Sequence, residues 1–167
     1  MAFYTLGYAS FDLAAICEAI GRAEATLVDV RMSPFSKKPG FRRKELQAAL
    51  AGRYAHLSEF GNVNYGERHS LGIEIRDYVK GREILGGIAS RTGRPVVLMC
   101  GCKDLHGCHR GVLAQALAKD GFDNLGELLS KNDGQKEEAF LSGEKKQIQT
   151  SITDFMEIKK PISKRRG

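Results

Sequence analysis

The chain has 167 residues, of which 42% are hydrophobic and 28% are charged, and it carries a formal net charge of +6 at pH 7. These values are typical of one soluble globular domain with room for an appendage. No run of about 18 apolar residues is present to span a bilayer, and the N-terminus lacks the basic stretch and apolar core of a signal peptide, so we expect an intracellular protein with no membrane partner.

The first 30 residues have the pattern of a parallel strand–helix–strand unit. Residues 2–6 predict a short strand, and Ser10 is placed to cap a helix whose apolar residues recur at helical spacing. Residues 26–30 predict a second, mostly apolar strand. A helix between two apolar strands is the usual crossover between parallel neighbours.

The rest of the first 130 residues alternates in the same way. A continuous apolar run over residues 94–100 is typical of a central parallel strand that is buried on both faces. The other expected elements are a helix over 44–51, a strand over 53–57, one or two helices over 71–88 interrupted near Gly81, and a helix over 111–119. The sequence therefore predicts a three-layer, Rossmann-like α/β domain with a mainly parallel sheet over residues 1–130.

Three of the four cysteines fall within nine residues, directly after the clearest strand: Cys100, Cys102 and Cys108. Because the chain has no secretory signal peptide, these cysteines favour metal binding or thiol chemistry over a disulfide framework. We predict Cys100 or Cys108 as a catalytic nucleophile, because a helix N-terminus and the guanidinium of Arg110 both favour a thiolate. Backbone N–H groups and Arg110 can instead hold the phosphate or carboxylate of a substrate.

Two other interpretations of this loop stay open. One is a zinc site, although the spacing C-x-C-x5-C-H is not that of a zinc ribbon or finger. Its ligands would come from Cys100, Cys102, His106, Cys108 and His109. The other interpretation is structural, with Cys100 as a compact buried residue and with Cys108 and His109 bracing a turn. We therefore expect no cofactor, with zinc at this loop as the alternative that stays open.

A second group of candidate residues follows the first two strands. Tyr8, Ser10 and Arg31 are predicted to bind an anionic ligand such as a nucleotide. Asp29 and His109 are predicted as acid–base or orienting groups. A purely structural ion pair between Asp29 and Arg31 is an equally good interpretation.

Residues 3–122 resemble the DUF488 family. The resemblance is carried by Tyr4-Thr-Leu-Gly-Tyr8, Val28-Asp-Val-Arg31, Tyr54-x-His56-Leu57, and Val97-Leu-Met-Cys100 with Cys108-His-Arg110. It implies an α/β fold and no particular reaction. The family usually has an acidic residue two positions after the first cysteine, where this chain has Cys102, and that departure favours thiol or metal chemistry.

A looser likeness is to rhodaneses and cysteine-dependent phosphatases. They too pair a strand ending in Asp-x-Arg with a later strand that ends in Cys and an anion-binding loop. Their loops are shorter than the nine residues that separate Cys100 from Arg110 here. The likeness implies a rhodanese-like fold, and it gives sulfur transfer or phosphate-ester hydrolysis as an alternative function.

The C-terminal region differs in composition from the rest of the chain. Residues 144–167 carry +4 of the net +6, and residues 131–147 are polar with few large apolar side chains. We predict a disordered tail made of a flexible linker over 131–147, a peptide motif over 148–160 and a basic end over 161–167.

Within this tail, Gln149, Ile152, Phe155 and Met156 resemble the PCNA-interacting peptide, or PIP box, Q-x-x-(I/L/M)-x-x-aromatic-aromatic. The motif is similar to the clamp-binding peptide of a eukaryotic cell-cycle inhibitor. One 3₁₀ turn would bring the three apolar anchors onto one face. Met156 stands where a second aromatic is usual, and it can still fill an apolar pocket. The resemblance implies a PCNA-type sliding clamp as partner, with DNA reached through the clamp and with help from the basic end.

These observations predict a DNA replication or repair protein that is recruited to the sliding clamp and whose domain acts on DNA or nucleotides. The alternatives are a sulfurtransferase, a cysteine-dependent phosphatase or a non-catalytic clamp adaptor, so whether the protein is an enzyme stays open. The expected location is the cytoplasm or nucleoid of an archaeon, or the nucleus of a eukaryote.

Overall fold

The computed structural model describes residues 1–67 and 71–130. Met1–Ser130 forms one compact unit. The linker, the PIP box and the basic end predicted over residues 131–167 lie outside the described residues. Within the described part of the chain, no helix is long and apolar enough to cross a membrane.

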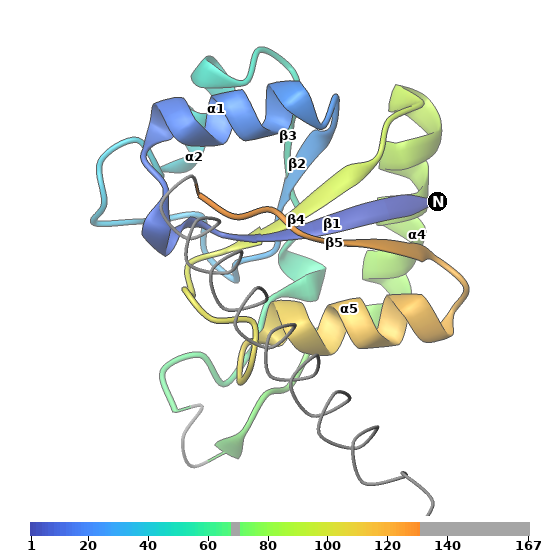
Figure 1. The fold of residues 1–167 in the computed structure, drawn as a ribbon. Coiled ribbons are helices and arrows are strands. Elements are labelled where there is room, and N and C mark those ends of the chain that lie inside the picture. Colours follow the sequence, from blue (N-terminus) through green and yellow to red (C-terminus); the bar gives the residue numbers. More distant parts are fainter. Residues whose placement is uncertain (68–70, 131–167) are drawn as a thin grey trace, which may run out of the picture. The chain divides into compact units, whose positions relative to one another are not determined.

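Five strands form one sheet in the order β3-β2-β4-β1-β5, and every strand pair is parallel (Figure 1). The strands are β1 (Ala2–Gly7), β2 (Thr26–Asp29), β3 (Tyr54–His56), β4 (Val96–Cys100) and β5 (Asp123–Glu127). All five residues of β4 are buried, as expected for a central strand that is covered on both faces. The predicted parallel α/β fold is confirmed.

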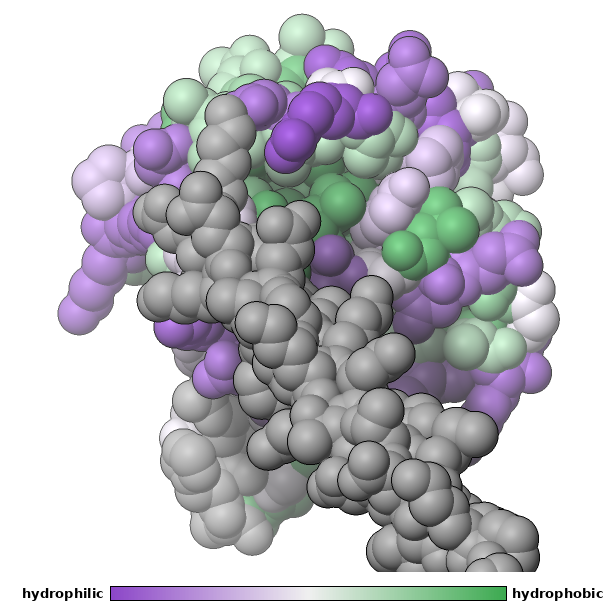
Figure 2. All heavy atoms as spheres, viewed as in Figure 1, coloured by the Kyte–Doolittle hydropathy of each residue, from purple (hydrophilic) through white to green (hydrophobic). Residues whose placement is uncertain are grey.

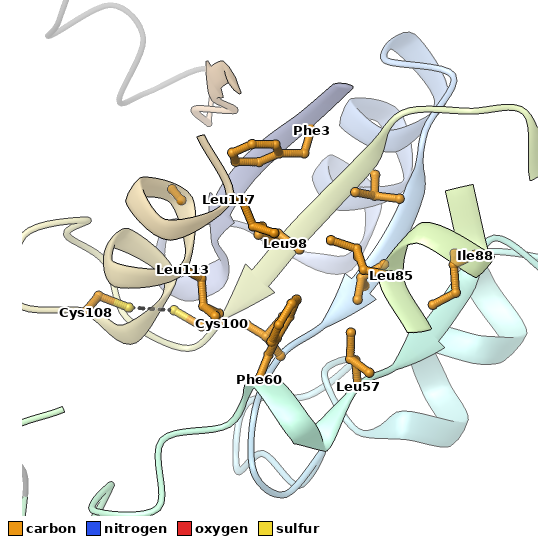
Figure 3. Close-up of a cluster of buried hydrophobic side chains, with 14 residues drawn as sticks. Phe3, Leu57, Phe60, Leu85, Ile88, Leu98, Cys100, Cys108, Leu113 and Leu117 are labelled. Atoms are coloured by element: carbon orange, nitrogen blue, oxygen red, sulfur yellow. Dashed lines mark hydrogen bonds between the residues drawn. The ribbon is translucent and has the colours of Figure 1, made fainter. Parts of the chain in front are cut away.

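Helices cover both faces of the sheet and complete the three layers (Figure 1). One face carries α1 (Leu13–Arg22) and α2 (Arg43–Ala49), and the other carries α4 (Tyr78–Thr92) and α5 (His109–Lys119). Side chains of β4 alternate between the two cores: Val97 and Met99 face α1 and α2, whereas Val96, Leu98 and Cys100 face α4 and α5 (Figure 3). This alternation places the Cys100 thiol on the α5 side of the sheet.

The surface between these elements is a mosaic of hydrophilic and hydrophobic residues, as Figure 2 shows for one face.

Two short 3₁₀ turns lead out of strands β1 and β3: η1 (Tyr8–Ser10) and η2 (Ser58–Phe60). Ser10 therefore ends a turn, and the prediction that it caps α1 is wrong. Asp12 is the cap, because its carboxylate accepts a hydrogen bond from the backbone N–H of Ala15 at 2.7 Å.

Two further predictions about elements differ from the structure. Helix α4 runs through Gly81 without interruption, and this glycine is buried where the ring of Phe60 packs against the helix. Strand β5 was not expected, because Asp123, Asn124 and Gly126 interrupt any apolar pattern and most of the strand is exposed. It extends the sheet by pairing with β1 alone.

The contact between Gly81 and Phe60 predicts a difference between two glycines of the same helix. A Cβ added at Gly81 would lie 2.5 Å from the Phe60 ring, whereas a Cβ added at Gly86 meets no atom within 4 Å. Gly81→Ala is expected to lower the free energy of unfolding by about 1–2 kcal/mol, since overpacking outweighs the gain in helix propensity. Gly86→Ala is expected to raise it by up to about 1 kcal/mol. Urea denaturation measures both, and equal effects would contradict the packing at Gly81.

Candidate functional site

The carboxyl ends of β1, β2 and β4 lie side by side, and the loops that follow them surround a pocket of about 260 Å³. This edge of a parallel sheet is where α/β proteins bind ligands. The pocket is lined by Tyr8, Arg31, Met32, Ser33, Phe35, Asn62, Tyr65, Gly101, Cys102 and His109. Four of the residues predicted from the sequence are thus brought together here: Tyr8, Arg31, Cys102 and His109.

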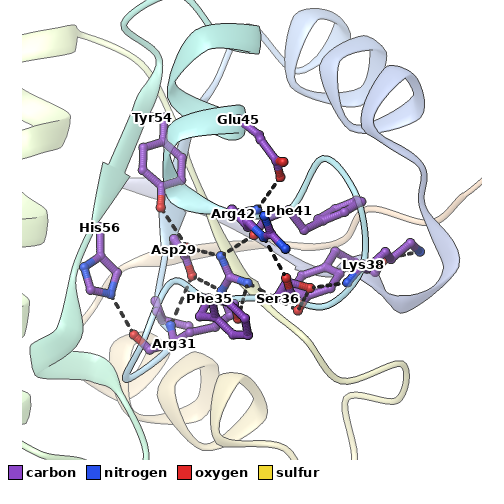
Figure 4. Close-up of polar contacts among 12 residues, drawn as sticks. Asp29, Arg31, Phe35, Ser36, Lys38, Phe41, Arg42, Glu45, Tyr54 and His56 are labelled. Atoms are coloured by element: carbon purple, nitrogen blue, oxygen red, sulfur yellow. Dashed lines mark hydrogen bonds and ion pairs between the residues drawn. The ribbon is translucent and has the colours of Figure 1, made fainter.

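Asp29 and Arg31 form a buried, two-pronged ion pair at the end of β2 (Figure 4). Arg31 Nε donates to Asp29 Oδ1 at 2.7 Å, and Nη2 donates to Oδ2 at 2.5 Å. Tyr54 also donates its hydroxyl to Asp29 Oδ2, at 2.8 Å. Asp29 therefore neutralises the guanidinium charge of Arg31, which corresponds to the structural ion pair that the sequence left open.

The pKa values of both partners of Asp29 reflect this arrangement. Burial by itself lowers the pKa of Arg31. The hydrogen bond and the charge of Asp29 raise the pKa by more than burial lowers it, so the net shift is upward. The pKa of Tyr54 is raised by burial and then by the charge of Asp29. Both groups are consequently held in their ordinary neutral-pH forms, Arg31 charged and Tyr54 protonated.

Arg31 also fixes the loop that follows β2 (Figure 4). Its Nη1 and Nη2 donate to the carbonyl oxygens of Phe35 and Phe41 at 3.4 and 3.0 Å, and Nη1 donates to the Tyr8 hydroxyl at 3.2 Å. Tyr8 in turn stacks on Phe41, with ring centroids 4.4 Å apart. Ser10 lies in the neighbouring turn and does not line the pocket.

Cys100 and Cys108 point toward each other beneath the pocket, on the α5 side of the sheet (Figure 3). Their sulfurs are 3.0 Å apart, and both residues are buried. The pKa of Cys100 is raised by its contacts with the thiols of Cys102 and Cys108 and by burial, although the charge of Arg110 opposes the shift. A buried, protonated thiol that does not line the pocket is poorly placed to attack a ligand bound there.

Arg110 braces the loop between β4 and α5. Its guanidinium is fully buried and donates to the carbonyl oxygens of Cys102 and Lys103 at 3.1 and 3.2 Å, and to Glu127 in an ion pair. Gly7 allows this approach, because a Cβ there would lie 2.2 Å from the Cys102 oxygen and 2.7 Å from Arg110 Nη1. Burial lowers the pKa of Arg110, but its interactions with Cys100, Glu127 and Cys108 raise it above its ordinary value. The Arg110 guanidinium is therefore fully engaged by partners within the protein and is not available to bind an anionic ligand.

His109 and His106 occupy different environments. His109 is buried, and its Nε2 lies 3.1 Å from the carbonyl oxygen of Val30. Because a carbonyl oxygen only accepts, Nε2 carries the proton, and Nδ1 is left as the acceptor that faces the Cys108 sulfur at 3.9 Å. Burial lowers the pKa of His109, which keeps the ring neutral. His106 is exposed, and neither His106 nor His109 belongs to the group of Cys100, Cys102 and Cys108, whose sulfurs all lie within 4.8 Å of one another.

Several residues of the site were not singled out from the sequence. Phe35, Asn62 and Tyr65 line the pocket, Tyr54 holds Asp29, and Glu127 pairs with Arg110. Tyr54 belongs to a motif that carries the family resemblance but had no predicted role of its own; that motif and its place in a predicted strand beside the one that carries Asp29 were the available signals. The others come from a loop or from the unexpected strand β5, and nothing local in the sequence marks them.

Comparison with known proteins places the chain in a family. No curated protein and no solved structure gives a match. The family model of DUF488, a domain of unknown function, matches residues 14–117, which is more than half of the chain and includes β2, β4 and the loop from Cys100 to Arg110. The chain belongs to the DUF488 family.

Proposed function

We propose that the domain binds DNA by stacking a base in the pocket at the carboxyl edge of the sheet, and that the C-terminal PIP box recruits it to a PCNA-type sliding clamp. The observation that carries the first part is the aromatic mouth of the pocket. Phe35 and Tyr65 are 64% and 61% exposed there, and Tyr8 contributes a third ring. Aromatic rings at a pocket mouth are suitable platforms for unpaired bases, since every base has a stacking face.

The size of the pocket favours one ring system. At about 260 Å³ it is smaller than the clefts of roughly 300–1,000 Å³ that hold drug-sized ligands. A neutral group is favoured, because Arg31, which lines the pocket, is neutralised by Asp29. Arg110 does not line the pocket and is paired with Glu127. A base therefore suits the pocket better than a phosphate does.

Cations for the phosphates lie outside the pocket. Lys37, Arg42, Arg43 and Lys44 are exposed in and after the loop that carries Phe35. The guanidinium of Arg42 lies over the Phe35 ring, with its carbon 5.6 Å from the ring centroid. Alternating cations and exposed aromatics are typical of surfaces that bind single strands.

The same geometry gives less support to a rhodanese-like or phosphatase-like reaction. Such chemistry needs a thiolate that faces the ligand and an arginine that is free to hold its anion. Here Cys100 is fully buried, and Arg110 is bound to Glu127 and to two backbone carbonyls. Cys102 is the cysteine that lines the pocket.

Fluorescence anisotropy with a labelled single-stranded oligonucleotide tests the DNA-binding surface. Phe35→Ala is expected to weaken binding about 5- to 150-fold, because stacking on an aromatic contributes about 1–3 kcal/mol per base. Val79→Ala is the control, since Val79 is 61% exposed on α4 and does not line the pocket. Equal affinities of the wild type and the Phe35 variant would overturn the base-stacking role.

Recruitment to the clamp is supported by the sequence of the tail, where Gln149, Ile152 and Phe155 match three anchors of the motif and Met156 supplies an apolar side chain at the fourth. In calorimetric titrations of a PCNA-type clamp with the full chain, the double change Ile152→Ala and Phe155→Ala is expected to weaken binding at least about 30-fold, as loss of interface hot spots does. Ile162→Ala, six residues beyond the motif, is expected to leave the affinity unchanged. Absence of binding by the wild type would contradict recruitment.

A further inference from the structure

Three soft ligand atoms converge behind the pocket, on the α5 side of the sheet. The sulfurs of Cys100, Cys102 and Cys108 all lie within 4.8 Å of one another, and Cys100 and Cys108 are 3.0 Å apart. In a tetrahedral zinc site with Zn–S bonds of about 2.3 Å, neighbouring sulfurs are about 3.8 Å apart. The Cys100–Cys108 separation is shorter than that value and the other two are at most 4.8 Å, so shifts of roughly 1 Å suffice to surround an ion.

A nitrogen atom that can bind a metal lies beside one of the three sulfurs, that of Cys108. The proton of His109 is on Nε2, where Val30 accepts it, so the lone pair of Nδ1 is directed toward the Cys108 sulfur at 3.9 Å. A metal-bound histidine almost always donates its other ring N–H in this way, often to a backbone carbonyl. The carbonyl of Val30, directly after β2, therefore already sets the ring orientation that such a ligand needs.

The surroundings also suit metal-bound thiolates. Arg110 Nη1 and the backbone N–H of Cys102 both donate to the Cys100 sulfur, at 3.0 and 3.4 Å. Hydrogen bonds of this kind orient ligands and stabilise their charge. Cys102 is half-buried and lines the pocket, so an ion has a path of entry from solvent.

We propose that Cys100, Cys102 and Cys108 bind one thiophilic divalent ion, zinc, and that His109, whose Nδ1 lies 3.9 Å from the Cys108 sulfur but outside the 4.8 Å group of the three sulfurs, moves in as the fourth ligand. Three thiolates and one imidazole are an ordinary ligand set for a structural zinc ion. Exposed His106, which the sequence also offered as a ligand, is not part of this set. Cys102 and His109 also line the pocket, but the test of the metal site is independent of DNA binding, because it is spectroscopic and uses the metal ion alone.

The test uses the full chain, reduced, stripped of metal by a chelator and kept free of oxygen. Titration with Co²⁺ is expected to give thiolate-to-cobalt charge-transfer absorption and the visible bands of a tetrahedral ion, saturating at one equivalent and lost when Zn²⁺ is added. Elemental analysis of the purified protein is expected to find one zinc per chain. A folded wild-type protein that gives no charge-transfer band would overturn the proposal.

Matched cysteine variants identify the ligands. Cys102→Ser removes one ligand from a half-buried loop position and is expected to weaken Co²⁺ binding more than about 100-fold, beyond the 10- to 100-fold that loss of an outer contact costs. Cys17→Ser is the control, because Cys17 packs on the α1 side of the sheet. Circular dichroism establishes that each variant is folded. Unchanged binding by the Cys102 variant, or an equal loss in the Cys17 variant, would contradict the assignment.

Two further measurements separate this site from its alternatives. His109→Gln is expected to change the visible bands of bound Co²⁺, and an unchanged spectrum would remove His109 from the ligand set.

The nearness of Cys100 and Cys108 also suits a disulfide in oxidising conditions. Mass spectrometry of the purified, unreduced protein is expected to show four free thiols after the metal is removed. A mass lower by two hydrogens would instead support the disulfide and count against the zinc site.

Discussion

Replacing Asp29 by Asn is expected to lower the free energy of unfolding by about 3–5 kcal/mol, because it leaves the buried guanidinium of Arg31 without its counter-charge. Asp29 is fully buried and accepts three side-chain hydrogen bonds, two from Arg31 and one from Tyr54. Urea denaturation followed by far-UV circular dichroism measures the change.

An exposed copy of the same arrangement provides the control. Asp120 accepts hydrogen bonds from the Tyr78 hydroxyl at 2.8 Å and from Arg82 at 2.9 Å, as Asp29 does from Tyr54 and Arg31. Both contacts lower the pKa of Asp120. Since its charges remain in water, Asp120→Asn is expected to leave the urea midpoint nearly unchanged. Equal losses in the two variants would show that burial is not what makes the Asp29 pair important.

Replacing Arg110 by Met is expected to cost a similar amount, about 3–5 kcal/mol, since the change strands the Glu127 carboxylate and removes the donors to two loop carbonyls. Met has nearly the shape of the arginine stem, so the loss comes from charge and hydrogen bonds more than from volume. Arg110→Lys is expected to be destabilising as well, because an ammonium group cannot reproduce the planar fork.

Two controls accompany the Arg110 variants. Arg91→Met removes an exposed arginine near the end of α4 and is expected to change the stability by less than about 0.5 kcal/mol. Adding Glu127→Gln to Arg110→Met removes the stranded charge and is expected to restore part of the loss, giving a positive coupling in a double-mutant cycle. Strictly additive effects would contradict the ion pair.

The elements with strong apolar patterns were predictable from the sequence, and those held by tertiary contacts were not. Strand β4 was evident because it is apolar throughout. Strand β5 carries no such pattern, since one neighbouring strand and exposure to solvent suffice for a polar edge strand. Helix α4 continues through Gly81 because Phe60, from a distant turn, requires the small residue there.

For the site, the sequence predicted which residues lie at the strand ends but not which way their side chains point. Cys100 follows the two-residue alternation of Val96 and Leu98 and so faces α5, whereas Cys102 lines the pocket. The acidic partners of Arg31 and Arg110 differ in how far they lie along the chain. Asp29, the partner of Arg31, is two residues away and could be predicted, whereas Glu127, the partner of Arg110, comes from β5. Local sequence cannot reveal that Arg110 forms an ion pair, because the position of its partner Glu127 depends on the pairing of β5 with β1.

The position of β1 within the sheet has a consequence for biosynthesis. This first strand pairs only with β4 and β5. Phe3 therefore cannot pair with Val96 until the intervening chain has been synthesised. At about 5–20 residues per second, roughly ninety residues take several seconds on the ribosome. During that time β2 and β3 can pair locally, but β1 has no neighbour. Such long sequence separation slows folding, so the domain is expected to acquire its native sheet only when nearly all of residues 1–130 have left the exit tunnel.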